Sequence, residues 1–319
     1  MFIIHEHGHP TPERWSPGMD KPHAPIWIDL YDPTDEERHC AAELTGLRVP
    51  ERSDVVNLAL SSRIRTDDDA MYLSIPYFAD AVEGHAPGPV GLVVTGRVLM
   101  TLRFADSPAF RLASDSCAEH RWESSADVLA TLIEAIVNFA AKRMEDVSAE
   151  LKKLSDRIFT PDRLGTPVLR ACMLEVGRLE GLQARNRSSM LGVQRIVSFV
   201  RAKQPEWMSD DVEVRLRVVD HDLRTLDEFD DQLTNKLQFL LDAALGFIST
   251  DQNHVMKVLT VTSVATIPPV ILAGIWGMNF KDMPELDLPY AYPVALGIIL
   301  LSMVLPVLFF KWRGWWSGD

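Results

Sequence analysis

The sequence predicts an α+β domain, then long helices, then a hairpin of two membrane-spanning helices. Three observations support this fold class. Apolar residues alternate with period two in the first third of the chain, and they recur every three or four residues after Ser124. Residues 258–280 form an apolar run without a charged side chain. At about 1.5 Å per residue, such a run can cross a hydrocarbon layer of about 30 Å as a helix.

Residues 1–122 are expected to form the α+β domain, with a mixed or antiparallel sheet. Residues 1–25 lack a regular period and are interpreted as a mobile tail, in which His5, His7 and His9 form an alternative transition-metal site. A helix is expected at about 35–46, with Thr34 as its N-cap. Strands are expected at 26–30, 54–56, 70–75, 90–94 and 98–102.

Residues 123–254 are expected to form a stalk of long helices. The first helix begins near Ser124, the second spans about 168–203, and the third begins near Ser209. No proline occurs from 206 to 267, so the third helix is predicted to continue into the apolar run. The alternative is a bundle that stops before Asn253 and is followed by a separate span.

Residues 255–319 are expected to form the membrane domain. Its first span covers about 256–279, its periplasmic loop about 280–291 and its second span about 292–311, and a short basic and aromatic tail follows. Pro268-Pro269 should kink the first span, which favours a position among neighbouring helices.

Three further features place the soluble part in the cytoplasm. Lys257, Lys311 and Arg313 flank the hairpin, so the positive-inside rule predicts that both termini are cytoplasmic. No apolar signal segment opens the chain. Three widely spaced cysteines, at 40, 117 and 172, fit a reducing compartment.

Composition and missing motifs exclude several function classes. The net charge is −13 and nearly all of it precedes Val258, which argues against a nucleic-acid partner. The acidity is compatible with cation attraction or with ordinary solubility. The sequence contains neither a Gly-rich phosphate loop nor a catalytic motif that we could identify, so we expect no nucleotide, no organic cofactor and no enzyme activity.

The tripeptide Gly277-Met278-Asn279 ends the first apolar run, and Met283-Pro284-Glu285-Leu286 follows it. This signature before the second of two C-terminal spans resembles the CorA family of divalent-cation channels. The resemblance covers roughly residues 240–316. It implies a funnel-shaped homopentamer in the bacterial inner membrane. This pentamer would be a passive Mg²⁺ channel driven by the membrane potential, with Co²⁺ and Ni²⁺ as further ions.

The resemblance also implies an ion path and a filter. A ring of Asn279 side chains, one per subunit, would accept hydrogen bonds from the water bound to Mg²⁺, which gives up that water reluctantly. The alternative for the face that would line the path is a helix–helix contact. That face comprises Asn253, Met256, Leu259, Ser263, Ile267, Val270 and Gly274.

Two acidic groups complete the expected sites. Glu285 and Asp287 in the loop are expected to attract cations. In the family, cytoplasmic Mg²⁺ bound between subunits closes the pore. The candidate regulatory residues here are Asp220 and Asp227, facing Asp80 or Glu83, and the alternative is a solvated helix face.

Two other functions stay open. A zinc transporter of the same superfamily is one, although Met283-Pro284-Glu285-Leu286 argues against it. The other is a hairpin that anchors a cytosolic sensing or scaffold domain.

Overall fold

The computed structural model describes most of the chain: residues 1–7, 12–16, 19, 22–58, 64–67, 69–76, 88–116, 122–160, 166–278 and 289–315. The chain divides into two compact units. The N-terminal unit comprises Met1–Phe159 and Met173–Leu240, and the C-terminal unit comprises Thr160–Cys172 and Leu241–Asp319.

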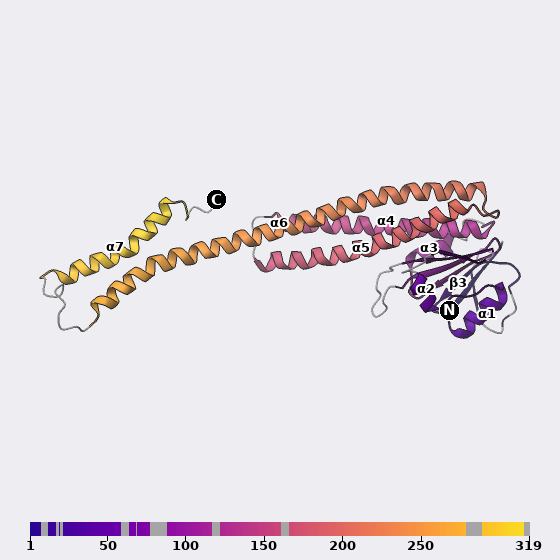
Figure 1. Ribbon diagram of the computed structural model, residues 1–319, viewed down its shortest axis with the longest axis horizontal. Coiled ribbons are helices and arrows are strands. Elements are labelled where there is room, and N and C mark those ends of the chain that lie inside the picture. Colours follow the sequence, from indigo (N-terminus) through magenta and orange to yellow (C-terminus); the bar gives the residue numbers. More distant parts are fainter. Residues whose placement is uncertain are drawn as a thin grey trace. The chain divides into compact units, whose positions relative to one another are not determined.

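A mixed sheet forms one part of the N-terminal unit (Figure 1). Its strand order is β2-β1-β3-β7-β6-β5-β4. Strands β3 and β7 pair in parallel and the other neighbours pair antiparallel, which confirms the predicted α+β class. The strands are β1 (Phe2–Glu6), β2 (Glu13–Trp15), β3 (Pro25–Tyr31), β4 (Ile64–Asp67), β5 (Ala70–Ile75), β6 (Val90–Val94) and β7 (Leu99–Arg103).

Two of the helices begin at a capping box. Thr34 forms a capping box with Glu37 at the start of α1, and Ser124 forms one with Asp127 at the start of α4. The helices are α1 (Asp35–Thr45), α2 (Arg52–Leu58), α3 (Pro108–Ser116), α4 (Ser125–Ile158), α5 (Thr166–Lys203), α6 (Asp210–Trp276) and α7 (Ala291–Trp312).

Alternating side chains of β3 and β7 bury both faces of the sheet. Ile28 and Met100 lie in the cluster that includes Ala41 of α1 and Val55 of α2. On the opposite face, Trp27 packs near Phe110 of α3, with their ring centroids 6.4 Å apart. The sheet is therefore covered on both sides, which explains why β5, β6 and β7 are buried along their whole length.

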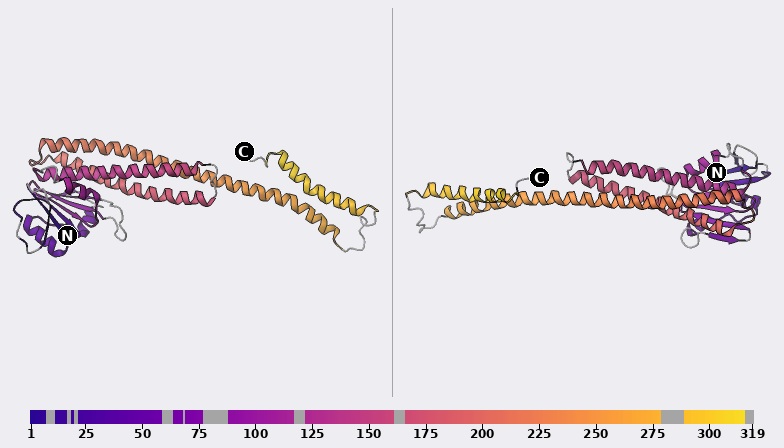
Figure 2. Two further views of the ribbon diagram at one scale, coloured as in Figure 1. Left: turned by 180° about the vertical axis from the view of Figure 1, so that it is seen from behind. Right: turned by 90° about the horizontal axis from the view of Figure 1, so that it is seen from above.

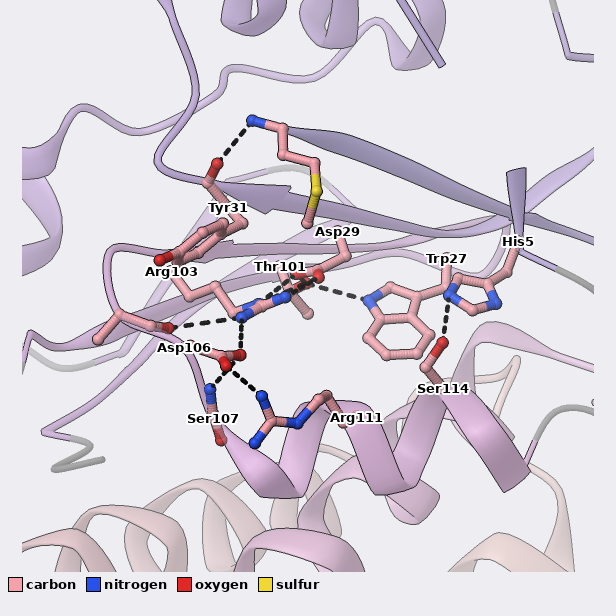
Figure 3. A network of polar contacts seen from close by, with 12 residues as sticks. His5, Trp27, Asp29, Tyr31, Thr101, Arg103, Asp106, Ser107, Arg111 and Ser114 are labelled. Carbon is pink, nitrogen blue, oxygen red and sulfur yellow. Dashed lines mark hydrogen bonds and ion pairs between the residues drawn. The ribbon is translucent and has the colours of Figure 1, made fainter. Parts of the chain in front are cut away.

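A buried ion pair crosses from β3 to β7 on this second face (Figure 3). The Arg103 Nη2 atom lies 2.8 Å from Oδ2 of Asp29, and its Nε atom lies 3.1 and 3.0 Å from the two carboxylate oxygens. The Thr101 hydroxyl donates to Asp29 at 2.7 Å and accepts from Trp27 Nε1 at 3.0 Å. Both charges are thus paired and hydrogen-bonded, as burial requires.

His5 lies next to this network, in the core and not in a mobile tail. Its ring stacks on Trp27 with centroids 4.5 Å apart, and it is 1% exposed. The Ser114 hydroxyl lies 3.4 Å from its Nε2 atom (Figure 3). The interpretation of residues 1–25 as a mobile tail is therefore wrong where β1 and β2 form. His5 is enclosed by aromatic rings, and His9 lies outside the described residues.

One expected strand is wrong and other elements were not expected. Residues 54–56 belong to the short helix α2, and Val55 of this helix packs into the core. Strand β4 and helix α3 were not expected. Both are short, and only a few residues in each follow a period, so periodicity alone does not identify them.

Helices α4, α5 and α6 run side by side in the N-terminal unit (Figure 2). Helix α5 closely approaches the residue that follows β5. The Ser189 hydroxyl of α5 donates to the Pro76 carbonyl at 2.7 Å. A Cβ atom on Gly192 would lie 2.5 Å from Cδ of Pro76, so this contact requires glycine. Helix α6 is continuous from Asp210 to Trp276, which confirms one long third helix over a bundle that stops before Asn253.

We predict a specific pH dependence from His5. Burial lowers the pKa of His5 to about 4, although Asp29 acts to raise it. An unfolded histidine has a pKa of about 6.5, so the unfolded chain binds more protons between these values. The free energy of unfolding should therefore fall by up to about 3 kcal/mol as the pH falls from about 6.5 to about 4.

The measurement is the melting temperature of the full chain in detergent against pH. His5→Phe keeps a ring against Trp27 and removes the titration, so its melting temperature should fall less than that of the wild type. His39→Phe, at an exposed position of α1, is the matched control and should keep the wild-type slope. Equal slopes for wild type and His5→Phe would contradict the prediction.

Candidate functional site

Two described helices, α6 and α7, are long and apolar enough to cross a membrane. In α6 the apolar part begins after Lys257, and α7 is apolar along nearly its whole length. Large apolar side chains are exposed on both, including Ile271 and Leu300. An apolar surface of this extent indicates lipid or protein neighbours rather than water.

The apolar part of α6 has one face covered within the chain. Val261 and Ala265 are buried, and Pro268, Leu272 and Trp276 on the same face are half-buried. Helix α7 runs back along this part of α6 (Figures 1 and 2). The half-buried residues of α7 recur mostly at helical spacing: Ala291, Ala295, Ile299, Ser302, Pro306, Val307 and Phe310.

The residues expected to line an ion path lie on the opposite face of α6. At 100° per residue, their directions are centred about half a turn away from Val261 and Ala265. This face is therefore mostly uncovered by the described part of the chain. Asn253, Met256, Leu259, Ile267, Val270 and Gly274 are exposed, and Ser263 is half-buried.

Threonine hydroxyls in this part of α6 bond within the helix. Thr260 donates to the Met256 carbonyl at 2.7 Å, and Thr266 donates to the Thr262 carbonyl at 2.8 Å. Helical structure also runs through Pro268 and Pro269, which lack the N–H groups that carbonyls four residues earlier would accept. The hydroxyl bonds let polar side chains lie in an apolar layer without unpaired donors.

The helix ends at the tripeptide. The Gly277 N–H donates to the Ala273 carbonyl at 2.9 Å, and the Met278 N–H donates to the Ile275 carbonyl at 3.2 Å. The second bond spans three residues where the first spans four, and this narrower turn ends the helix. Asn279, Glu285 and Asp287 lie outside the described residues, so their expected roles stay predictions.

The expected regulatory acids of α6 have arginine partners within the chain. Asp220 lies 3.3 Å from Arg201 of α5 and 3.1 Å from Arg224, one turn further along α6. Asp227 lies 3.3 Å from Arg187. Asp220 and Arg224 are four residues apart, which is the spacing of a helical ion pair, so the sequence itself contains the signal for this contact.

No metal cluster forms around these acids in the part of the chain that the structure describes. There, no three His, Cys, Asp or Glu side chains are arranged to hold a metal ion. Asp80 and Glu83, the residues expected to face them, lie outside that part. A regulatory cation site at these positions stays a prediction.

The chain is similar to known proteins along nearly its whole length. A family model described as "CorA-like Mg2+ transporter protein" matches residues 23–312. The magnesium transport protein CorA of Mannheimia succiniciproducens is 30% identical over 300 residues, covering 91% of this chain and 92% of that protein. The CorA protein of Escherichia coli K12 is 30% identical over 299 residues, with the same coverage.

A solved structure supports the fold. The complete CorA magnesium transporter of Methanocaldococcus jannaschii matches with a TM-score of 0.75 at 19% identity, covering 99% of this chain and 98% of that one.

The helix end predicts an effect of substitution at Gly277. A Cβ atom there would lie 3.1 Å from the Ala273 carbonyl oxygen, a tight contact that this carbonyl must relieve by moving a few tenths of an ångström. Gly277→Ala should speed amide exchange in the last turn of α6 about fivefold, for a local cost of about 1 kcal/mol. Gly297→Ala in α7 is the control, because a Cβ atom there meets nothing within 4 Å. Unchanged exchange at Gly277→Ala, measured by mass spectrometry, would contradict this.

Proposed function

The chain belongs to the family of CorA-like Mg²⁺ transporters, and we propose that it is a passive Mg²⁺ channel of the bacterial inner membrane. Members of this family are transporters and not enzymes. The observation that carries the proposal is the uncovered face of α6, which continues to Gly277 and Met278 of the signature tripeptide. Co²⁺ and Ni²⁺ are further candidate ions.

The membrane potential supplies enough energy for entry. Two positive charges that cross inward gain about 4.6 kcal/mol per 100 mV. Transport therefore needs no nucleotide, in keeping with a sequence in which we found no phosphate-binding loop.

The path is formed between subunits. In a homopentamer the uncovered faces of five α6 helices surround one axis, and the faces that carry Val261 and Ala265 turn toward α7. Met256, Leu259 and Ile267, all more than half exposed in the single chain, are the apolar constrictions. Apolar rings of this kind can stop conduction by losing water.

Selection takes place at the outer end of the path. Five Asn279 carboxamide oxygens accept hydrogen bonds from the water bound to Mg²⁺, and a neutral ring releases a divalent ion more readily than a charged ring does. Glu285 and Asp287 raise the local cation concentration within about 8 Å, the range that physiological salt leaves unscreened.

Both termini face the cytoplasm. Lys257 precedes the apolar part of α6, and Lys311 and Arg313 end α7, so three of the four basic residues of the hairpin flank it on the side of the termini, and the fourth, Lys281, is in the loop with Asp282, Glu285 and Asp287. The C-terminal unit thus crosses the lipid bilayer twice.

Cytoplasmic Mg²⁺ provides feedback. We place it between subunits, at Asp220 or Asp227 of one and Asp80 or Glu83 of its neighbour. Asp227 is the better placed, because its side chain is 47% exposed and has one arginine contact, whereas that of Asp220 is 13% exposed and has two. Loss of the ion would leave like charges facing each other and would loosen the closed state.

Two alternatives have less support. A zinc transporter of the same superfamily is less favoured, because the relatives above are named magnesium transport proteins. A membrane-anchored sensing or scaffold protein would give no flux at all.

Flux through liposomes tests the proposal. Purified wild type should carry Mg²⁺ inward when the potential is negative inside, and Zn²⁺ more slowly. Asn279→Ala should lower the Mg²⁺ rate about tenfold or more, since a hydrogen bond to a charged group contributes about 1.5–3 kcal/mol. Asn235→Ala, at an exposed position of α6 outside the apolar part, is the control and should keep the rate. A wild-type rate of Mg²⁺ flux through Asn279→Ala would contradict the role of Asn279 as the filter.

A further inference from the structure

One arginine of α5 meets three carboxylates of α6 within the N-terminal unit. The Arg187 Nη1 atom lies 3.0 Å from Oδ2 of Asp230 and 2.9 Å from Oδ1 of Asp231. Its Nη2 atom lies 3.3 Å from Oδ1 of Asp227. With all three carboxylates ionised, this group carries two uncompensated negative charges.

Asp230 is the buried member of the group. Its side chain is 1% exposed, whereas those of Asp227 and Asp231 are 47% and 62% exposed. Its Oδ2 atom contacts Arg187, but its Oδ1 atom has no hydrogen-bond partner among the described residues. A buried carboxylate oxygen without a donor destabilises the fold.

A second buried oxygen at the same turn also lacks a donor. The Gln183 Nε2 atom donates to the Asp230 carbonyl at 2.8 Å and to the Thr234 hydroxyl at 2.8 Å. These two bonds hold the amide of Gln183 against α6. Its Oε1 atom is buried without a hydrogen-bond partner in the described chain. Each of the two facing helices α5 and α6 therefore contributes one buried acceptor that lacks a donor.

A donor for Oδ1 of Asp230 or Oε1 of Gln183 must fit into the packing as it stands. Neither oxygen is accessible to water in this packing, so a water molecule or a hydrated cation would need added space to reach them. A proton needs no added space. When it binds a carboxylate oxygen, that oxygen becomes an O–H donor. We propose that Asp230 binds a proton in the folded protein and that its O–H group donates to Oε1 of Gln183.

Electrostatics agree with this geometry. Burial raises the pKa of Asp230 above its ordinary value, and Asp227 and Asp231 raise it further, while the charge of Arg187 and the neighbouring amide group of Gln183 lower it. From the third helix, α4, Arg143 and Asp146 reach the cavity of about 230 Å³ that Gln183 also lines. Protonation reduces the charge of the Arg187 group from −2 to −1 and leaves its arginine contacts in place.

The proton strengthens the contact between α5 and α6. A group whose folded pKa is raised stabilises the fold at low pH, and this stabilisation is lost as the pH rises through the folded pKa. Proton release therefore weakens the contact between α5 and α6. Helix α6 is the helix that continues into the first apolar span. This input is separate from the ion that the protein carries.

Infrared spectroscopy of the full chain in lipid nanodiscs tests the proposal. With ¹³C-labelled aspartate, the wild type should show the carbonyl stretch of a protonated aspartate at a pH where exposed carboxylates have ionised, and this band should disappear as the pH is raised further. Asp230→Asn should lose the band. Asp231→Asn, which removes an exposed contact of the same arginine, should keep it.

Thermal melting gives a second readout. Asn at position 230 supplies an N–H donor for Gln183 and a carbonyl for Arg187, so the variant should fold. Its melting temperature relative to the wild type should increase as the pH rises, because only the wild type loses its donor. Absence of the band in the wild type, its persistence in Asp230→Asn, or parallel melting profiles would each overturn the proposal.

Discussion

The structure depends on one constraint: α6 must be stable both in water and in a hydrocarbon layer while remaining one helix. Backbone polar groups in hydrocarbon must bond within the chain, and a helix meets this need at every residue except where proline interrupts it. In the N-terminal unit α6 is held by buried leucines such as Leu216 and Leu240 and by ion pairs to α5. In the C-terminal unit its threonines bond to its own carbonyls.

The same constraint separates the chemistry of the two units. Charged contacts between helices, such as Arg187 with Asp230, occur where water can reach part of the group. After Lys257, α6 has uncharged side chains, with one face partly buried within the chain and the opposite face mostly exposed. A helix so divided can transmit a change in its soluble contacts to its apolar part without an intervening loop.

Much of the fold could be predicted because long elements repeat their signal. The stripe from Leu129 to Ile158 and the uninterrupted pattern after Ser209 predicted α4 and α6, and local capping at Thr34 predicted the start of α1. Short elements failed for the opposite reason. In β1 only five residues carry the pattern, and the prolines and histidines that follow obscured it. Val55 is apolar in either a strand or a helix, so α2 was assigned to the wrong type.

Some parts of the candidate site could be predicted from the sequence and others could not. The apolar face of α6 follows from spacing, but the meaning of Gly277-Met278-Asn279 came from family resemblance and not from physical reasoning on one chain. The partners of Asp220 and Asp227 depend on which residues of α5 face α6, and the weak apolar stripe of α5 does not define that orientation. Buried acceptors such as Oε1 of Gln183 are properties of packing, which sequence does not display.

The central claim is that the uncovered face of α6 lines a path between subunits, and disulfide formation between copies tests it most directly. In a background where Cys40, Cys117 and Cys172 are replaced by serine, single cysteines at Leu259 and Val261 can be compared in native membranes under mild oxidation. The account predicts covalent dimers from Leu259→Cys and none from Val261→Cys, whose side chain is buried within its own chain. Dimers from Val261→Cys without dimers from Leu259→Cys would contradict it.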